Sequence, residues 1–124
     1  MVLRLFISLL CAVGVYASVF MYRKGRLAAL GLLDEFSVVH RPRARLFWVP
    51  NSALGILYYG AMLLGIWLLH GRLWLLLEAA SVLAAGTSVV LAASLLRANL
   101  DCRYCWASHA VNWTIVLLLP LLYV

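Results

Sequence analysis

Residues 51–96 read NSALGILYYGAMLLGIWLL, then HGR, then LWLLLEAASVLAAGTSVVLAASLL, which are two long apolar runs joined by three residues. The runs cover residues 51–69 and 73–96, and each has about the 20 residues that a helix needs to cross a bilayer core about 30 Å thick. Because the connection is so short, the two helices must run antiparallel. This stretch therefore predicts a helical hairpin that spans a membrane.

The rest of the chain has the same character, with further apolar runs at residues 2–22 and 103–124. The 124 residues are 67% hydrophobic with a mean hydropathy of +1.04, far above the roughly half-apolar composition of soluble domains. We therefore predict an all-α integral membrane protein in which residues 1–124 form a single domain, a bundle of four transmembrane helices. Its partner is the lipid bilayer, and we expect no nucleic-acid partner.

The predicted loop at residues 23–50 is the one long connection. Within it, apolar residues recur at three-residue steps, the pattern of a short amphipathic segment that lies on a membrane surface. These residues are Leu27, Leu30, Leu33, Phe36 and Val39. We expect the segment to cover the mouth of the bundle.

The basic residues are distributed unevenly between the two ends of the predicted bundle. Eight belong to the end that carries the long loop: Arg23, Lys24, Arg26, Arg41, Arg43, Arg45, Arg97 and Arg103. The opposite end carries Arg4 and Arg72. Because short cytoplasmic loops are enriched in Lys and Arg, this bias predicts that the loop end faces the cytoplasm. The periplasmic or extracellular side is the alternative.

The third predicted helix carries two features of note. Small residues line one face and favour close packing against a neighbouring helix; they are Ser81, Ala85, Ser88 and Ala92. Glu78 follows Arg72 by six residues, a rise of about 9 Å along a helix. We expect Glu78 to lie near an interface, facing Arg72 or lipid headgroups, and not to form a functional site.

The polar stretch RANLDCRYCWASHAVNW, residues 97–113, precedes the last apolar run. Cys102 and Cys105 are three residues apart, so both thiols lie on nearly the same helical face, close enough for a disulfide. Asp101 can cap the helix, and the helix N-terminus together with Arg103 favours a thiolate. Because thiol–disulfide exchange requires a thiolate, the pair is predicted to be redox-active. Cys11 lies alone in the first helix and is given no role.

His109 and Asn112 follow Cys105 by four and seven residues, on the same face and deeper in the bundle. Polar side chains at that depth need a partner, and one polar ligand would satisfy both. A zinc site built on Cys102, Cys105 and His109 would still need a fourth ligand from His40 or water, so we expect no metal. Haem attachment is excluded because Trp106 stands where the motif requires histidine. A purely structural cysteine pair is the remaining alternative.

Two motifs resemble the vitamin K epoxide reductase family and its microbial homologues. They are DCRYCWASHAVNW, residues 101–113, and RLFWVPNSALGILYYG, residues 45–60. Their order also agrees with the family: a first helix, a long loop, the P-N-S-x-x-G-x-x-Y-Y motif, and a C-x-x-C followed by an asparagine. The resemblance implies a four-helix bundle that holds a quinone, such as ubiquinone, menaquinone or a related molecule, near the C-x-x-C.

The resemblance also implies roles for individual residues. Cys105 matches the cysteine that passes electrons to the quinone, and Cys102 matches the one that exchanges with an incoming dithiol. Asn51 matches the asparagine that hydrogen-bonds a quinone carbonyl. His109 stands where vertebrate members have a tyrosine, and its ring can donate a hydrogen bond to the same ligand. We assign Asn112, below His109, to the same quinone-binding group.

The sequence departs from the family in two respects. Members typically carry two shuttle cysteines in the first loop, whereas no cysteine lies between Cys11 and Cys102 here. Cys102 would then receive electrons directly from an external dithiol. The charge bias also predicts a cytoplasmic site, inverted relative to the bacterial members, and an enzyme forming disulfides in the cytosol is physically coherent in organisms with disulfide-rich cytosols.

Together these features predict a membrane thiol–disulfide oxidoreductase that passes electrons from a thioredoxin-like dithiol protein to a membrane quinone and so supports protein disulfide formation. One alternative is a small four-helix transporter, but the acid that such a transporter needs in its first helix is absent. The other is a non-catalytic assembly subunit, which the missing loop cysteines keep open.

Overall fold

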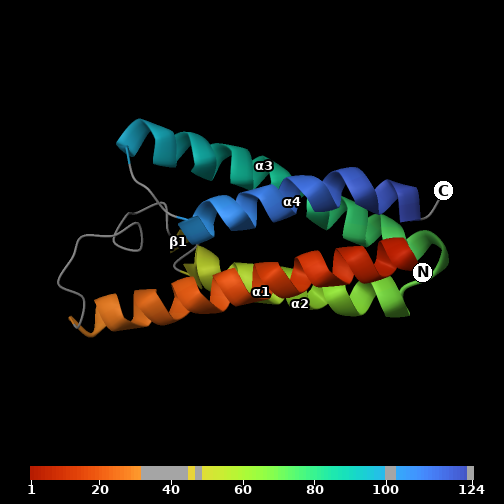
Figure 1. Cartoon of the computed structure of the whole chain (residues 1–124), viewed down its shortest axis with the longest axis horizontal. Helices are drawn as coiled ribbons and strands as arrows, with labels where there is room; N and C mark the ends of the chain where they lie inside the picture. Colours follow the sequence, from red (N-terminus) through yellow and green to blue (C-terminus); the bar gives the residue numbers. More distant parts are fainter. Residues whose placement is uncertain (32–44, 47–48, 100–102, 123–124) are drawn as a thin grey trace.

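The computed structural model describes residues 1–31, 45–46, 49–99 and 103–122. Its elements are α1 (Val2–Ala29), β1 (Arg45–Leu46), β2 (Val49–Pro50), α2 (Asn51–Leu68), the 3₁₀ helix η3 (Gly71–Leu73), α3 (Trp74–Ala98) and α4 (Arg103–Leu122). The four α-helices alternate in direction along one long axis, and both chain termini lie at the same end (Figure 1). The predicted four-helix bundle is therefore confirmed.

Length and composition make α1, α3 and α4 candidate membrane spans, over Val2–Leu27, Gly71–Arg97 and Arg103–Leu122. The fourth helix, α2, is shorter, with 18 residues, or about 27 Å at a rise of about 1.5 Å per residue. That length is at the lower end of what crosses a hydrocarbon core. The chain is thus a multi-pass membrane protein with three long spans and one short one.

The first helix is longer than predicted, because α1 continues seven residues past Tyr22 and ends at Ala29. The predicted loop therefore begins later than residue 23. Hydropathy falls at the basic cluster, but Arg and Lys are good helix formers, and cations near a helix C-terminus interact favourably with its dipole. Gly31 follows with a φ of +72°, the left-handed conformation that commonly terminates a helix.

The other helix boundaries lie within a few residues of the predicted ones. The turn at His70 contains Gly71 with a φ of +61° and passes through η3 into α3. Asn99, with a φ of 54°, ends α3, and asparagine is among the few residues other than glycine that adopt this conformation readily.

Part of the predicted loop forms a small hairpin, in which β1 pairs antiparallel with β2, immediately before α2. Of the predicted amphipathic segment, Leu27 lies in α1 and Leu30 in the turn after it, and both are exposed. The remaining three positions lie outside the described residues. The segment's placement over the bundle mouth therefore stays a prediction.

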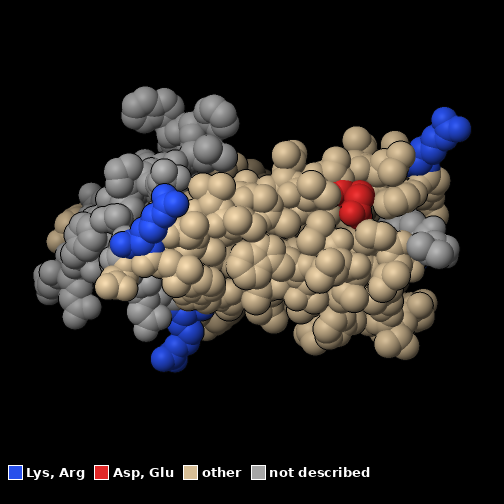
Figure 2. All heavy atoms as spheres, turned by 90° about the horizontal axis from the view of Figure 1, so that it is seen from above, with Lys and Arg blue, Asp and Glu red and all other residues tan. Residues whose placement is uncertain are grey.

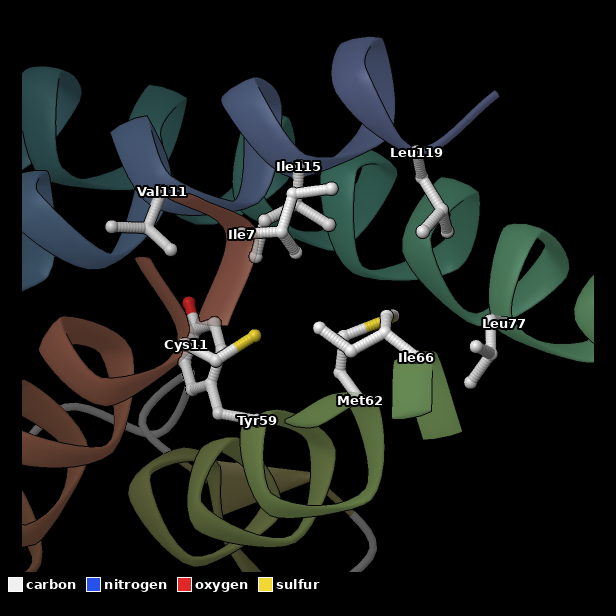
Figure 3. Close-up of a cluster of buried hydrophobic side chains, with 9 residues drawn as sticks. All are labelled: Ile7, Cys11, Tyr59, Met62, Ile66, Leu77, Val111, Ile115 and Leu119. Carbon is white, nitrogen blue, oxygen red and sulfur yellow. The ribbon is translucent and has the colours of Figure 1, made fainter. Parts of the chain in front are cut away.

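A buried apolar cluster holds the bundle together (Figure 3). Helix α1 packs against both α2 and α4, while α3 packs mainly against α4. The members of the cluster are Ile7, Cys11, Tyr59, Met62, Ile66, Leu77, Val111, Ile115 and Leu119. Cys11 is a free thiol with no exposed surface, in agreement with its expected role as a small apolar side chain.

The surface also fits a bilayer. Many large apolar side chains are exposed along all four helices, as expected of a face that contacts lipid tails. Figure 2 shows basic side chains toward the two ends of the molecule, with a long middle region that carries none of them on this face.

Candidate functional site

Cys105 lies in the first turn of α4, at the end of the bundle where α1 and α3 finish (Figure 1). Tyr104, the preceding residue, stacks on Phe20 of α1 with ring centroids 4.0 Å apart and an interplanar angle of 18°. Its ring also lies 6.3 Å from that of Tyr16. These contacts fix the start of α4 against α1, and they set the position from which Cys105 projects.

Cys105 is half-buried and disulfide-bonded. The predicted partner Cys102 and the predicted cap Asp101 lie outside the described residues. Because α4 begins at Arg103, Cys105 is its third residue, within the turn where backbone N–H groups lack helical partners. A thiolate released there on reduction would be stabilised by those N–H groups and by the helix dipole.

His109 lies one turn deeper in α4 and is only 6% exposed. Neither Nδ1 nor Nε2 has a hydrogen-bond partner among the described residues. The imidazole lies between two tryptophan rings of the same helix: Trp106 is edge-on at 6.0 Å, and Trp113 is roughly parallel at 6.1 Å. A buried imidazole without partners costs about 1–3 kcal/mol, and a polar ligand that hydrogen-bonds the ring would remove that cost.

Asn112 is part of a hydrogen-bonded network between helices. Its Oδ1 accepts from the Tyr59 hydroxyl on α2, and its Nδ2 donates to Ser88 Oγ on α3 at 2.6 Å. The Tyr59 oxygen also lies 3.1 Å from the carbonyl oxygen of Ser108 and 3.2 Å from its Oγ. Both ends of the Asn112 amide are thus engaged by protein groups, in contrast to the imidazole of His109.

Asn51, the third predicted quinone ligand, is the first residue of α2. The start of α2 lies at the same end of the bundle as the start of α4 (Figure 1). The side chain of Asn51 is outside the described part of the structure, so its predicted hydrogen bond to a quinone stays a prediction.

The small-residue face of α3 packs inward as predicted, since Ser81, Ser88 and Ala92 are all buried. The Trp113 Nε1 atom donates across the same interface to the carbonyl oxygen of Ala85 at 3.3 Å. Glu78 lies in the second turn of α3, at the end of the bundle opposite Cys105. It is half-buried, and one of its carboxylate oxygens has no hydrogen-bond partner among the described residues.

The sequence predicted Ser88 as part of a close-packing face but not as a hydrogen-bond partner, and it indicated no role for Ser108 or for Tyr59 beyond the Y-Y pair of the quoted motif. A hydroxyl on an apolar helix is a signal that a polar contact is needed, but only the packing identifies the partner. As to metals, no group of three or more His, Cys, Asp and Glu side chains gathers in the described part of the chain, and Cys102, which the zinc interpretation requires, is not in that part.

These features define a class: a small multi-pass helical membrane protein with a disulfide-bonded cysteine at the head of its last helix and, one turn below, a buried imidazole that no described residue hydrogen-bonds. Comparison with known families matches residues 5–119 to the vitamin K epoxide reductase family. The chain belongs to that family. No curated protein and no solved structure gave a match. The family is a four-helix membrane bundle, and membership implies a thiol–quinone oxidoreductase kind of function.

Proposed function

We propose that the protein is an enzyme that oxidises a thioredoxin-like dithiol protein and reduces a membrane quinone, and that it thereby supports protein disulfide formation. The observation that carries this proposal is the pairing of a disulfide-bonded Cys105 with a buried His109, one helical turn below it, whose ring nitrogens have no hydrogen-bond partner within the described ranges. The first supplies a two-electron redox centre, and the second supplies a hydrogen-bonding group for a polar substrate.

In the first half-reaction, a thiolate of the partner attacks the Cys102 sulfur of a Cys102–Cys105 disulfide. The bond between the two sulfurs breaks, Cys105 leaves as a thiolate, and a mixed disulfide forms at Cys102. The partner's second thiol then attacks the partner's first sulfur in that mixed disulfide. Cys102 leaves as a thiolate, and the partner is released with a disulfide of its own. The cysteine pair has gained two electrons and two protons. Because no cysteine lies between Cys11 and Cys102, Cys102 receives these electrons without a loop relay.

In the second half-reaction, the pair returns to the disulfide state as two electrons and two protons pass to a quinone, which becomes a quinol. His109 fits such a substrate because an imidazole N–H can donate to a quinone oxygen and then hold or move a proton there. The flanking rings of Trp106 and Trp113 suit a flat aromatic ligand. Asn51 is proposed as a second donor.

The proposal is tested by mixing purified protein with reduced thioredoxin and a short-chain ubiquinone and following quinone absorbance. The double variant Cys102→Ser with Cys105→Ser is expected to lose all protein-dependent reduction. Cys11→Ala is the matched control, since Cys11 is buried and free. Equal rates for the wild type and the double variant would refute the oxidoreductase function.

We also propose that the redox end of the bundle faces the cytoplasm. Among the described residues, Arg23, Lys24 and Arg26 lie at the end of α1, and Arg97 and Arg103 lie at the adjoining ends of α3 and α4. The opposite end carries Arg4 and Arg72. The positive-inside rule assigns the richer end to the cytoplasm.

After mild reduction of intact cells, a membrane-impermeant thiol reagent is therefore expected to leave Cys102 unlabelled until the cells are opened. The buried Cys11 should remain unlabelled in both conditions, because it has no exposed surface. A Cys102→Ser variant identifies the labelled position. Full labelling of Cys102 in unopened cells would place the redox end outside and reverse the orientation.

A further inference from the structure

We infer that Tyr59 is a positioning residue for quinone binding. It acts through hydrogen bonds with Ser108 and Asn112 of α4, and through Asn112 with Ser88 of α3, and these bonds position the turn of α4 that carries Cys105 and His109. The inference rests on the proposed function and concerns residues that touch neither the thiols nor the substrate. It also places Asn112 behind the substrate site, where its amide links helices.

Tyr59 makes contact with every other helix of the bundle, directly or through one further residue. Its side chain is 1% exposed and projects from α2 into the buried cluster (Figure 3). The ring packs on Gly14 of α1 so closely that a Cβ at residue 14 would lie 2.6 Å from ring carbons. The hydroxyl reaches Ser108 and Asn112 on α4.

Asn112 extends the hydrogen-bonded network from Tyr59 to α3. The single hydroxyl hydrogen of Tyr59 can serve the Asn112 Oδ1 atom, while its oxygen accepts from Ser108 Oγ at 3.2 Å. The Asn112 Nδ2 atom then donates to Ser88 on α3, which is 2% exposed. The same network therefore fixes α4 against α2 and α3, while the Tyr59 ring holds α2 against α1.

The network is well placed to control the site. Ser108 lies between Cys105 and His109 in sequence, and Asn112 lies one turn below. Lipid supplies no hydrophobic drive for helix association, so polar contacts between helices strongly influence how each helix is rotated. An imidazole nitrogen is about 6 Å from its helix axis, so a rotation of α4 by about 10° would move it by about 1 Å. Displacements of that size can impair catalytic geometry severely.

Tyr59→Phe tests the inference because it removes only the bonded hydroxyl. Tyr58→Phe is the matched control: Tyr58 is adjacent on α2, and its hydroxyl has no hydrogen-bond partner among the described residues. Two quantities are measured: the Kd of a short-chain ubiquinone from quenching of tryptophan fluorescence, and the rate at which reduced thioredoxin reduces the Cys105 disulfide. Trp106 and Trp113 flank His109 and report on the site.

Tyr59→Phe is expected to raise the quinone Kd about tenfold, the effect of losing one well-formed interhelical contact. The thioredoxin step should remain within about twofold of the wild type, because the proposed attack is on Cys102, which precedes α4 in the sequence, and a freely diffusing partner can adjust to a small rotation of that helix. Tyr58→Phe should leave both quantities within about twofold. If Tyr59→Phe does not fold, Ser88→Ala, which removes only the acceptor of Asn112 Nδ2, should raise the Kd about threefold.

Three results would overturn the inference: an unchanged quinone Kd in Tyr59→Phe, an equal increase in Tyr58→Phe, or a parallel loss of both quantities, which indicates general destabilisation. For Ser88→Ala, an unchanged Kd or a parallel loss would do the same. A wild-type protein that neither binds quinone nor reacts with thioredoxin would refute the proposed function and this inference together. Normal wild-type behaviour with a normal Tyr59→Phe would refute the inference alone.

Discussion

Cys105→Ser is expected to lower quinone reduction by more than about 1,000-fold while leaving Cys102 able to capture the thiol partner. The first effect follows because a serine hydroxyl cannot form the disulfide that accepts the two electrons from the partner. The second follows because Cys102 is the proposed point of entry, and its exchange with a partner sulfur needs no second thiol in this chain. One substitution thus separates the two half-reactions.

The capture is measured with a thioredoxin variant that has one active-site cysteine, activated as a mixed disulfide with thionitrobenzoate. Displacement of thionitrobenzoate by Cys102 releases a coloured thiolate and leaves a covalent complex that dithiothreitol reverses. Cys102→Ser is the matched variant, and we expect it to form little complex because Cys105 is half-buried. Faster capture by Cys102→Ser than by Cys105→Ser would exchange the proposed roles of the two cysteines.

The sequence was sufficient to predict the bundle because hydropathy and connection length are local properties. Two apolar runs joined by His70, Gly71 and Arg72 have only one simple arrangement, and the structure confirms it. The end of α1 was predicted less well: the apolar run stops near Tyr22, but the helix continues through the basic residues to Ala29. Hydropathy locates the part of a helix in lipid, and not the part that extends beyond it.

In the candidate site, too, the sequence predicted the features that depend on local pattern and not those that depend on packing between helices. His109 was identifiable because a polar residue deep in an apolar helix needs a partner, and the structure leaves its imidazole without one among the described residues. The hydrogen bonds that Asn112 makes to other helices were not predictable from the sequence. Its partners Tyr59 and Ser88 are 53 and 24 residues away in sequence, and only the rotation of each helix brings them together. Pairwise contacts between transmembrane helices are weakly encoded in composition, since all the helices are similarly apolar.

His109→Leu is expected to have opposite effects on activity and stability. Quinone-dependent kcat/KM should fall about 30-fold, equivalent to about 2 kcal/mol, the usual size of a lost hydrogen bond to a buried polar substrate group. The free energy of unfolding without quinone should rise by about 1–2 kcal/mol, because leucine removes two buried nitrogens that have no partners among the described residues. A residue retained at a cost to stability is characteristic of a binding site.

Both effects are measurable on the same purified sample, by quinone absorbance and by thermal unfolding in detergent with and without a short-chain ubiquinone. In the wild type, ubiquinone should raise the unfolding temperature, because a ligand that binds only the native state stabilises it. That increase should largely disappear in His109→Leu and partly return in His109→Gln, which keeps an N–H donor. A leucine variant that is less stable than the wild type yet still fully stabilised by ubiquinone would show that the imidazole is a structural group and that quinone binds elsewhere.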